Sequence, residues 1–190
     1  MLAFEVAKRL PDGEVQFLGS FNLPPHIAWR MRQLTWSSCL FNLAHFLGLV
    51  TSEWAAEMMH GAQQYASRPK QALVALVLDT APHSRLSDLG LDSPALIAWA
   101  DLSFCLCNIA VDYTPSGSVS ALDIFHAEPL RAAAKSREDW INNHLSKWGD
   151  FCSGEVGFHQ VPGQHYTMLS PEHVVEFSQI LKKALKGRDL

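Results

Sequence analysis

The stretch from Glu155 to Leu169 constrains the fold of this chain more than any other part of its sequence. Residues 155–161 predict a strand, and Gly163 marks a turn directly after it. His165 lies on that turn, and Ser170-Pro171 predicts the start of a terminal helix. A strand, a tight turn and a helix in this order are typical of α/β proteins with a parallel sheet. We therefore expect an α/β fold in which His165 follows the last strand.

The beginning of the chain predicts another piece of the same kind of sheet. Leu2, Val6 and Leu10 recur on one helical face, and residues 15–19 then read as a short buried strand. Sheet signals return at residues 119–125, after a long stretch of helical patterns. We expect a mainly parallel sheet flanked by helices.

The middle of the chain predicts a helical insert between these strands. Residues 70–78 are short and rich in Val and Leu, so their pattern fits either a helix or a strand. Ser93 is the predicted N-cap of a further helix, with Pro94 at its first position. The expected organisation is a helix and strand of the core at 1–25, a helical lid insert at 26–115, and the remaining core at 116–190.

Composition excludes several other classes of protein. The 190 residues are 48% hydrophobic and 18% charged, which is typical of an ordered globular protein. A net charge of −4 without a basic patch argues against a nucleic-acid partner. Asp101 interrupts the apolar stretch 94–111, so we expect no membrane span. The four cysteines form no zinc or disulfide pattern and predict reduced residues in a cytoplasmic protein.

Several blocks of the sequence resemble the thioesterase domains of nonribosomal peptide and polyketide synthases. Leu2–Ala7 resembles the helix that follows the nucleophile elbow, and Val161–Tyr166 resembles the loop of the catalytic histidine. The blocks Phe21–Ile27 and Arg30–Trp36 are similar to the thioesterase domain of fungal synthetases with adenylation, thiolation and thioesterase domains. The resemblance extends over essentially the whole chain.

The resemblance implies an α/β-hydrolase fold and a releasing enzyme. Fungal synthetases of this type join two aryl α-keto acids into quinones, furanones or butenolides by Claisen- or Dieckmann-type condensation. The substrate would arrive on the phosphopantetheine arm of a thiolation (carrier) domain, after an adenylation domain has activated the aryl acid. No cofactor bound to this domain is expected, and neither is a metal.

The sequence departs from the family pattern at the nucleophile. It contains no G-x-S-x-G elbow, so we expect the serine to lie outside these residues, on an N-terminal segment or a second chain. An open parallel edge as apolar as residues 15–18 should also be covered by a preceding segment or partner.

His165 is the candidate general base, because a neutral imidazole can take a proton at physiological pH. The third member of a triad has three candidates. Asn22 occupies the neighbourhood where many relatives carry the acid, and an Asn can orient an imidazole without supplying charge. Glu128 follows the strand 119–125, although a turn carboxylate beside Pro129 explains it equally. Asp79 in the insert would require an unusual lid geometry.

Aromatic and methionine side chains of the insert are candidates for an apolar substrate pocket. The alternative is that they form the core of the lid helices. The candidates for substrate binding are Trp54, Met58, Trp99 and Phe104.

Three other functions remain open at this point. The domain could be a simple acyl-thioester hydrolase with water as the acceptor. It could be a non-catalytic remnant that binds aryl ligands or serves as a scaffold. It could also be one part of a split enzyme whose second chain donates the elbow.

Overall fold

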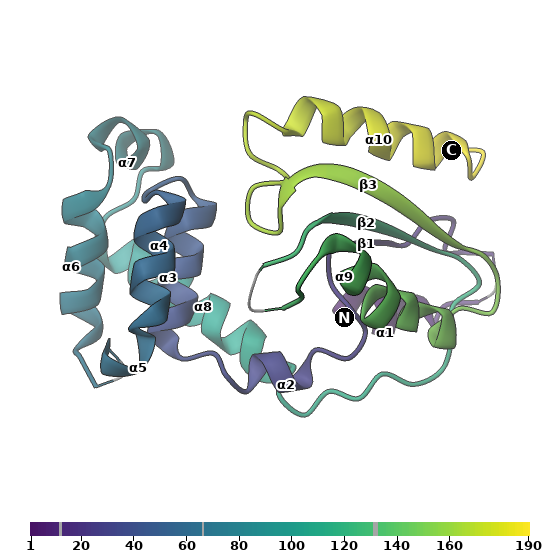
Figure 1. Cartoon of the computed structure of the whole chain (residues 1–190), viewed down its shortest axis with the longest axis horizontal. Helices are drawn as coiled ribbons and strands as arrows, with labels where there is room; N and C mark the ends of the chain where they lie inside the picture. The colour runs from purple at the N-terminus through teal and green to yellow at the C-terminus, as the bar shows by residue number, and fades with distance from the viewer. Residues whose placement is uncertain (12, 66, 131–132) are drawn as a thin grey trace. The chain divides into compact units, whose positions relative to one another are not determined.

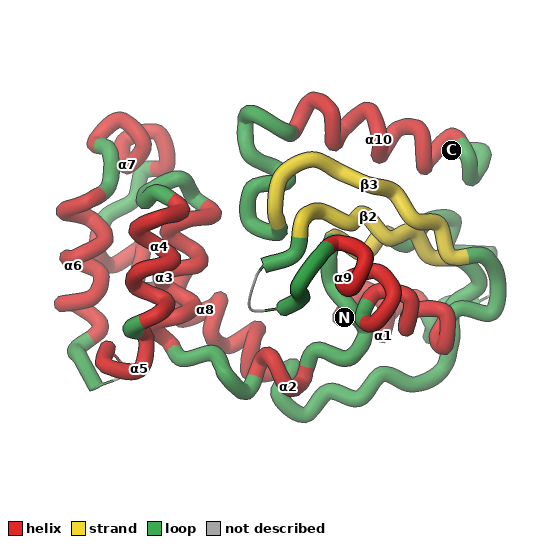
Figure 2. Tube along the Cα trace, in the orientation of Figure 1, coloured by secondary structure: helices red, strands yellow, loops and turns green. Residues whose placement is uncertain are grey.

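The computed structural model describes residues 1–11, 13–65, 67–130 and 133–190, which divide into two compact units (Figures 1 and 2). Unit 1 comprises Met1–Ile27 and Tyr113–Leu190, and unit 2 comprises Ala28–Asp112.

Unit 1 contains the strands and the helices that cover them. Its elements are α1 (Leu2–Ala7), β1 (Gly19–Phe21), β2 (Leu122–Glu128), α9 (Arg137–Asn143), the 3₁₀ helix η1 (Leu145–Phe151), β3 (Val156–Gln164) and α10 (Val174–Lys186).

Within the described residues, the strands form one parallel sheet in the order β1-β2-β3. The central strand β2 is buried from Leu122 to Ala127, as expected of a parallel strand covered on both faces. Leu122 and Ile124 pack with α1, α9 and η1, whereas Phe125 and Ala127 pack with α10. Figure 1 shows α10 running beside β3. The predicted α/β class with a parallel sheet flanked by helices is confirmed.

The strand boundaries differ from those that the sequence predicts. β1 begins at Gly19, whereas residues 15–18 are extended but outside the strand. The backbone ladder explains the difference, because β1 pairs with β2 from Gly19 opposite Asp123 onward. Val15, Phe17 and Leu18 are nevertheless half-buried against the two cores of unit 1. The apolar pattern of these residues therefore indicates that they pack against the core, but it does not indicate that they pair in the sheet.

The second strand is displaced in the same way. β2 covers Leu122–Glu128 instead of residues 119–125, and Val119 forms only an isolated bridge with Cys152. The terminal helix also starts later than predicted, at Val174, because residues 166–173 form turns after β3. Helix α9 is capped by Ser136, because the Asp139 amide donates to Ser136 Oγ at 3.1 Å.

Unit 2 consists of helices in its described residues. They are α2 (Ala28–Met31), α3 (Trp36–Phe46), α4 (Ser52–His60), α5 (Ala62–Tyr65), α6 (Lys70–Thr80), α7 (His83–Leu89) and α8 (Ser93–Ile109). Residues 70–78, whose pattern fits a helix or a strand, therefore belong to a helix. The N-cap of α8 is Asp92 and not Ser93, because Asp92 Oδ1 accepts from the Ala95 amide at 2.8 Å.

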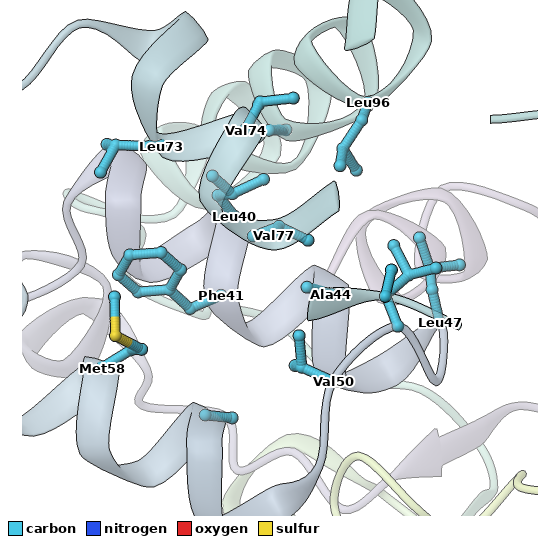
Figure 3. Close-up of a cluster of buried hydrophobic side chains, with 14 of the residues drawn as sticks. Leu40, Phe41, Ala44, Leu47, Val50, Met58, Leu73, Val74, Val77 and Leu96 are labelled. Atoms are coloured by element: carbon cyan, nitrogen blue, oxygen red, sulfur yellow. The ribbon is translucent and has the colours of Figure 1, made fainter. Parts of the chain in front are cut away.

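An apolar cluster lies among the described helices of unit 2, and Figure 3 shows part of it. Leu40 and Phe41 of α3 are fully buried, as are Val74 and Val77 of α6 and Leu96 of α8. Side chains from three helices thus meet without reaching solvent, which gives unit 2 a hydrophobic core of its own.

None of the described helices is by itself long and apolar enough to cross a membrane. The pair α7 and α8, bent by 72°, passes that test by length and composition only.

Candidate functional site at the carboxyl edge of the sheet

His165 directly follows β3, on a turn fixed by its own backbone. Gly163 has φ +76, a conformation that side chains disfavour, and a Cβ there would lie 2.6 Å from His173 Cδ2. The Gln164 amide donates to Thr167 Oγ1 at 2.9 Å, and the Gln164 carbonyl accepts from the amides of Thr167 and Met168. Gly163 and these hydrogen bonds therefore fix the conformation of the turn that carries His165.

The ring of His165 hydrogen bonds to the backbone carbonyl of Asn22, the residue that directly follows β1. Strands of a parallel sheet end at the same edge, so residues from the ends of β1 and β3 meet there. The structure thus brings together two of the residues that the sequence nominated.

The side chain of Asn22 is engaged elsewhere. Its Oδ1 accepts from Trp140 Nε1 at 2.7 Å and from the Ala127 amide at 3.3 Å, and the residue is 2% exposed. Its φ of +54 is in the left-handed region, which Asn tolerates better than most residues. The contact with His165 therefore uses the carbonyl of Asn22, while the amide ties β1 to α9 and β2.

Two opposing effects set the pKa of His165. Burial lowers it, because the charged imidazolium loses hydration, and the carbonyl of Asn22 raises it by accepting from the ring. Burial is the larger effect, so the pKa lies below its ordinary value and the ring is neutral at physiological pH. The ring also contacts Tyr166 edge-on, with 5.0 Å between centroids.

The other candidates for a triad acid lie in different surroundings. Glu128 is the last residue of β2 and pairs with Arg137 Nη2 at 3.2 Å, with 52% of its side chain exposed. Glu128 is therefore part of the strand, whereas the sequence predicted that it follows the strand. Asp79 is an exposed residue of α6 in unit 2.

The predicted substrate-binding residues all belong to unit 2. Trp54 packs edge-on against Phe41, with centroids 5.6 Å apart. Met58 is buried and accepts a hydrogen bond from the Tyr65 hydroxyl at 3.6 Å. Both residues therefore pack in the core of this unit. The remaining candidates are an exposed Trp99 and a half-buried Phe104.

A second histidine pairs with a buried carboxylate that sequence reasoning did not single out. Asp123 on β2 is 3% exposed and accepts from His159 Nε2 at 2.7 Å and from Arg188 Nε at 3.0 Å. His159 also stacks on Phe125. Asp123 lies at the amino end of β2, away from the edge that carries His165, so this cluster joins β2, β3 and the segment after α10. An Asp among the apolar residues Leu122, Ile124 and Phe125 was the available signal.

Trp140 is the other residue that the sequence did not indicate. It packs in the apolar core that α1, β2 and η1 share, and its indole also donates to Asn22. Only its place in a short helix was visible in the sequence, and that place did not reveal its partner.

A cavity of about 270 Å³ lies at the other edge of the sheet, beside the start of β2. Lys8, Val15, Ser120 and Ser153 are among the residues that line it. The Lys8 ammonium is already bonded to Glu5 and to the Ser116 carbonyl. This cavity is therefore separate from the site around His165. Among the described residues, no group of three or more His, Cys, Asp or Glu could hold a metal ion.

Comparison with known proteins supplies the family context. No family model matches the sequence. Aspulvinone E synthetase of Aspergillus terreus is 46% identical over 192 residues, and atromentin synthetase of Suillus grevillei is 41% identical over 192 residues. A nonribosomal peptide synthetase of Aspergillus terreus is 48% identical over 194 residues. These alignments cover 100% of this chain and 19–21% of each relative, so the chain spans about a fifth of their length.

Solved structures agree on the fold. The wild-type Vlm2 thioesterase domain has a TM-score of 0.59 at 22% identity, covering 96% of this chain and 64% of that chain. The same domain bound with a dodecadepsipeptide has a TM-score of 0.58, also at 22% identity, and covers 96% and 63% of the two chains. The chain is thus a homologue of a segment of fungal nonribosomal-peptide-synthetase-like enzymes, and its fold is that of a thioesterase domain.

Proposed function

We propose that this chain is part of a thioesterase domain of the α/β-hydrolase type in secondary-metabolite biosynthesis. The domain would release carrier-bound aryl α-keto acid units and join them by carbon–carbon bond formation. The homology to aspulvinone E and atromentin synthetases supports this reading, as does the thioesterase fold. The observation that supports it most directly is the half-buried ring of His165, held by the Asn22 carbonyl at the carboxyl edge of the sheet.

In the first step, His165 would act as general base toward a serine hydroxyl supplied from outside these 190 residues. The serine oxygen attacks the thioester carbonyl, and His165 takes the hydroxyl proton. The carbon–sulfur bond then breaks, and the phosphopantetheine thiolate leaves with the proton that His165 returns. An acyl-serine and a free carrier thiol result.

In the second step, His165 would remove a proton from the α-carbon of a second carrier-bound unit. The carbanion attacks the acyl-serine carbonyl, a carbon–carbon bond forms, and the serine oxygen leaves and takes the proton from His165. The contact with Asn22 fixes the ring for both steps, with a carbonyl dipole where a triad acid would supply a negative charge. Glu128 and Asp79 remain the alternative candidates for that acid.

The direction of the His165 pKa shift gives this mechanism a pH dependence. The base must be neutral, and burial holds the His165 pKa below its ordinary value. The rate should therefore be lost only as the pH falls below about 6.5, the ordinary pKa of a histidine.

The partners follow from the same proposal. The relatives are about five times as long as this chain, which leaves room for adenylation and thiolation domains. We propose that the thiolation domain delivers the aryl acid on its phosphopantetheine arm, and that the exposed Trp99 and the half-buried Phe104 contribute to an apolar substrate pocket. The domain would need no bound cofactor and would work in the cytoplasm.

Product analysis tests the proposal. The protein is the longer polypeptide in which adenylation and thiolation domains and the segment that supplies the serine precede these residues. It is supplied with ATP and an arylpyruvic acid. We expect a coupled ring product from the wild type and loss of at least a hundredfold in its rate for His165→Ala, since general base catalysis contributes about 10²–10⁴-fold. His83→Ala, which changes an exposed histidine of α7, is the matched control and should retain the rate.

The other functions predict different products. A hydrolase would regenerate the arylpyruvic acid, so His165-dependent consumption of ATP without a coupled ring would identify it. Binding of the aryl acid to the 190-residue chain itself, unaffected by His165→Ala and without a coupled product from the longer polypeptide, would identify a non-catalytic module. Coupled product from a variant that lacks His165 would refute the role assigned to this residue.

A further inference from the structure

Two cysteine side chains approach each other inside unit 2. The Sγ atoms of Cys39 on α3 and Cys107 on α8 lie 3.9 Å apart, with Cys39 as the hydrogen-bond donor. Cys39 is 2% exposed, whereas Cys107 is half-buried. One sulfur is therefore enclosed in the unit, and the other is within reach of a small solute.

We propose that Cys39 and Cys107 form an oxidation site, which a small hydroperoxide converts into a disulfide between α3 and α8. This inference is independent of the proposed function, because it requires neither His165 nor a serine nucleophile. It also goes beyond the expectation that all four cysteines are reduced residues.

The two thiols differ in a way that assigns their roles. The hydrogen bond from Cys39 stabilises the thiolate of Cys107 and lowers the pKa of Cys107 to about 7, against the cost of its burial. The same hydrogen bond and burial raise the pKa of Cys39. Since the thiolate is the nucleophile, the more exposed Cys107 attacks first and Cys39 completes the bond.

The chemistry balances in two steps. The Cys107 thiolate attacks one oxygen of the hydroperoxide, the O–O bond breaks, and an alcohol or water leaves after taking a proton, giving a sulfenic acid. The Cys39 sulfur then attacks the Cys107 sulfur, the S–S bond forms and the S–O bond breaks. The hydroxide leaves as water with the Cys39 proton. Two thiols have been oxidised by two electrons, and the hydroperoxide has been reduced.

The packing of α3 against α8 in unit 2 holds Cys39 and Cys107 next to each other. Leu40, which follows Cys39, packs in the same buried cluster as Leu96 and Ala100 of α8. Ser103, one turn before Cys107, also hydrogen bonds with Cys39. Bond formation requires the sulfurs to approach from 3.9 Å to about 2.05 Å.

Cys105 provides a matched control on the same helix. It lies two residues from Cys107, so its side chain points to a different side of α8, and it is exposed. Accessibility alone would make Cys105 the preferred target of an oxidant, whereas our proposal selects the less exposed Cys107.

The experiment exposes the purified 190-residue chain to hydrogen peroxide, blocks the remaining thiols with N-ethylmaleimide, and measures the intact mass and a non-reducing peptide map. We expect one disulfide, which lowers the intact mass of the chain by about 2 Da before the remaining thiols are blocked. The peptide map should contain a linked peptide that joins Cys39 to Cys107. Cys105→Ser should give the same linked peptide. Cys39→Ala and Cys107→Ala should each abolish it, and dithiothreitol should reverse it.

Other results would overturn the proposal. A wild-type map without the linked peptide would do so, whether the cysteines remain free, become sulfinic acids, or form dimers through Cys105. The wild-type map decides the question even if the alanine variants fail to fold. If the link forms, it closes a loop between residues 68 positions apart, so the melting temperature of the oxidised chain should exceed that of the reduced chain.

Discussion

At the scale of single residues, Asn22 shows how one side chain and its backbone can serve different partners. Its left-handed conformation directs the carbonyl to His165, while Oδ1 accepts from Trp140 and Ala127. The sequence could nominate Asn22 and His165 through its resemblance to thioesterase domains, which carry triad residues after the corresponding strands. It could not reveal Trp140, since a hydrogen bond across 118 residues has no local signature.

The Trp140 hydrogen bond gives the first prediction. Trp140→Phe keeps an aromatic ring but removes the donor to a buried acceptor, so the free energy of unfolding should fall by about 1–2 kcal/mol. Urea denaturation followed by circular dichroism measures the change. Trp99→Phe, at an exposed indole, should change it by less than about 0.5 kcal/mol. Equal effects of the two substitutions would contradict the role of the hydrogen bond.

Gly163 gives a second prediction at the same scale. Gly163→Ala adds a Cβ at φ +76 that would lie 2.6 Å from His173 Cδ2 and 2.9 Å from Thr167 Oγ1. Gly13→Ala introduces a comparable strain at φ +88, but no described atom lies within 4 Å of the added carbon. We expect a loss of about 1 kcal/mol at Gly13 from backbone strain alone. The loss at Gly163 should exceed it by about 1–3 kcal/mol because of crowding.

The same denaturation measurement compares the two glycine variants. If Gly163→Ala were no more destabilising than Gly13→Ala, the turn that carries His165 would have room to rearrange. The position of the His165 ring would then not be fixed by its turn.

At the scale of elements, the residue that caps the start of α8 differs from the one that the sequence predicts. The Ser93-Pro94 pattern predicts a Ser cap, whereas the Ala95 amide donates to Asp92. Asp92→Ala should therefore lower the melting temperature, corresponding to a loss of about 1 kcal/mol in stability. Ser93→Ala is the matched control and should leave it nearly unchanged. A larger effect of the Ser93 substitution would restore the original assignment.

The boundaries of β1 and β2 were predicted less accurately than the existence of these strands, for a physical reason. The sequence located β1 and β2 to within a few residues, because apolar runs report burial. Their boundaries depend on ladder partners such as Gly19 and Asp123, which are far apart in the chain. Helix α6 also depends on distant contacts. Its short apolar run fits a helix or a strand, and it forms a helix that packs in the core of unit 2.

At the scale of the whole molecule, the order of elements was predictable because it follows from local patterns. A parallel sheet interrupted by a helical insert is what the chain forms, and the thioesterase structures share that fold. Contacts between distant side chains, such as Asp123 with His159 and Arg188, follow only once the strands are paired.

The helical insert should also fold without the rest of the chain. Leu40, Val77 and Leu96 are fully buried by other residues of unit 2, so its core is complete within residues 28–112. Its ends are close together, because Arg32 Nη2 lies 3.0 Å from Asp112 Oδ1. A peptide of residues 28–112 should therefore show helical circular dichroism and a cooperative thermal transition. Because that ion pair is exposed, Arg32→Ala should change its stability by less than about 1 kcal/mol. A peptide that melts without cooperativity would mean that the core of unit 2 depends on residues outside it.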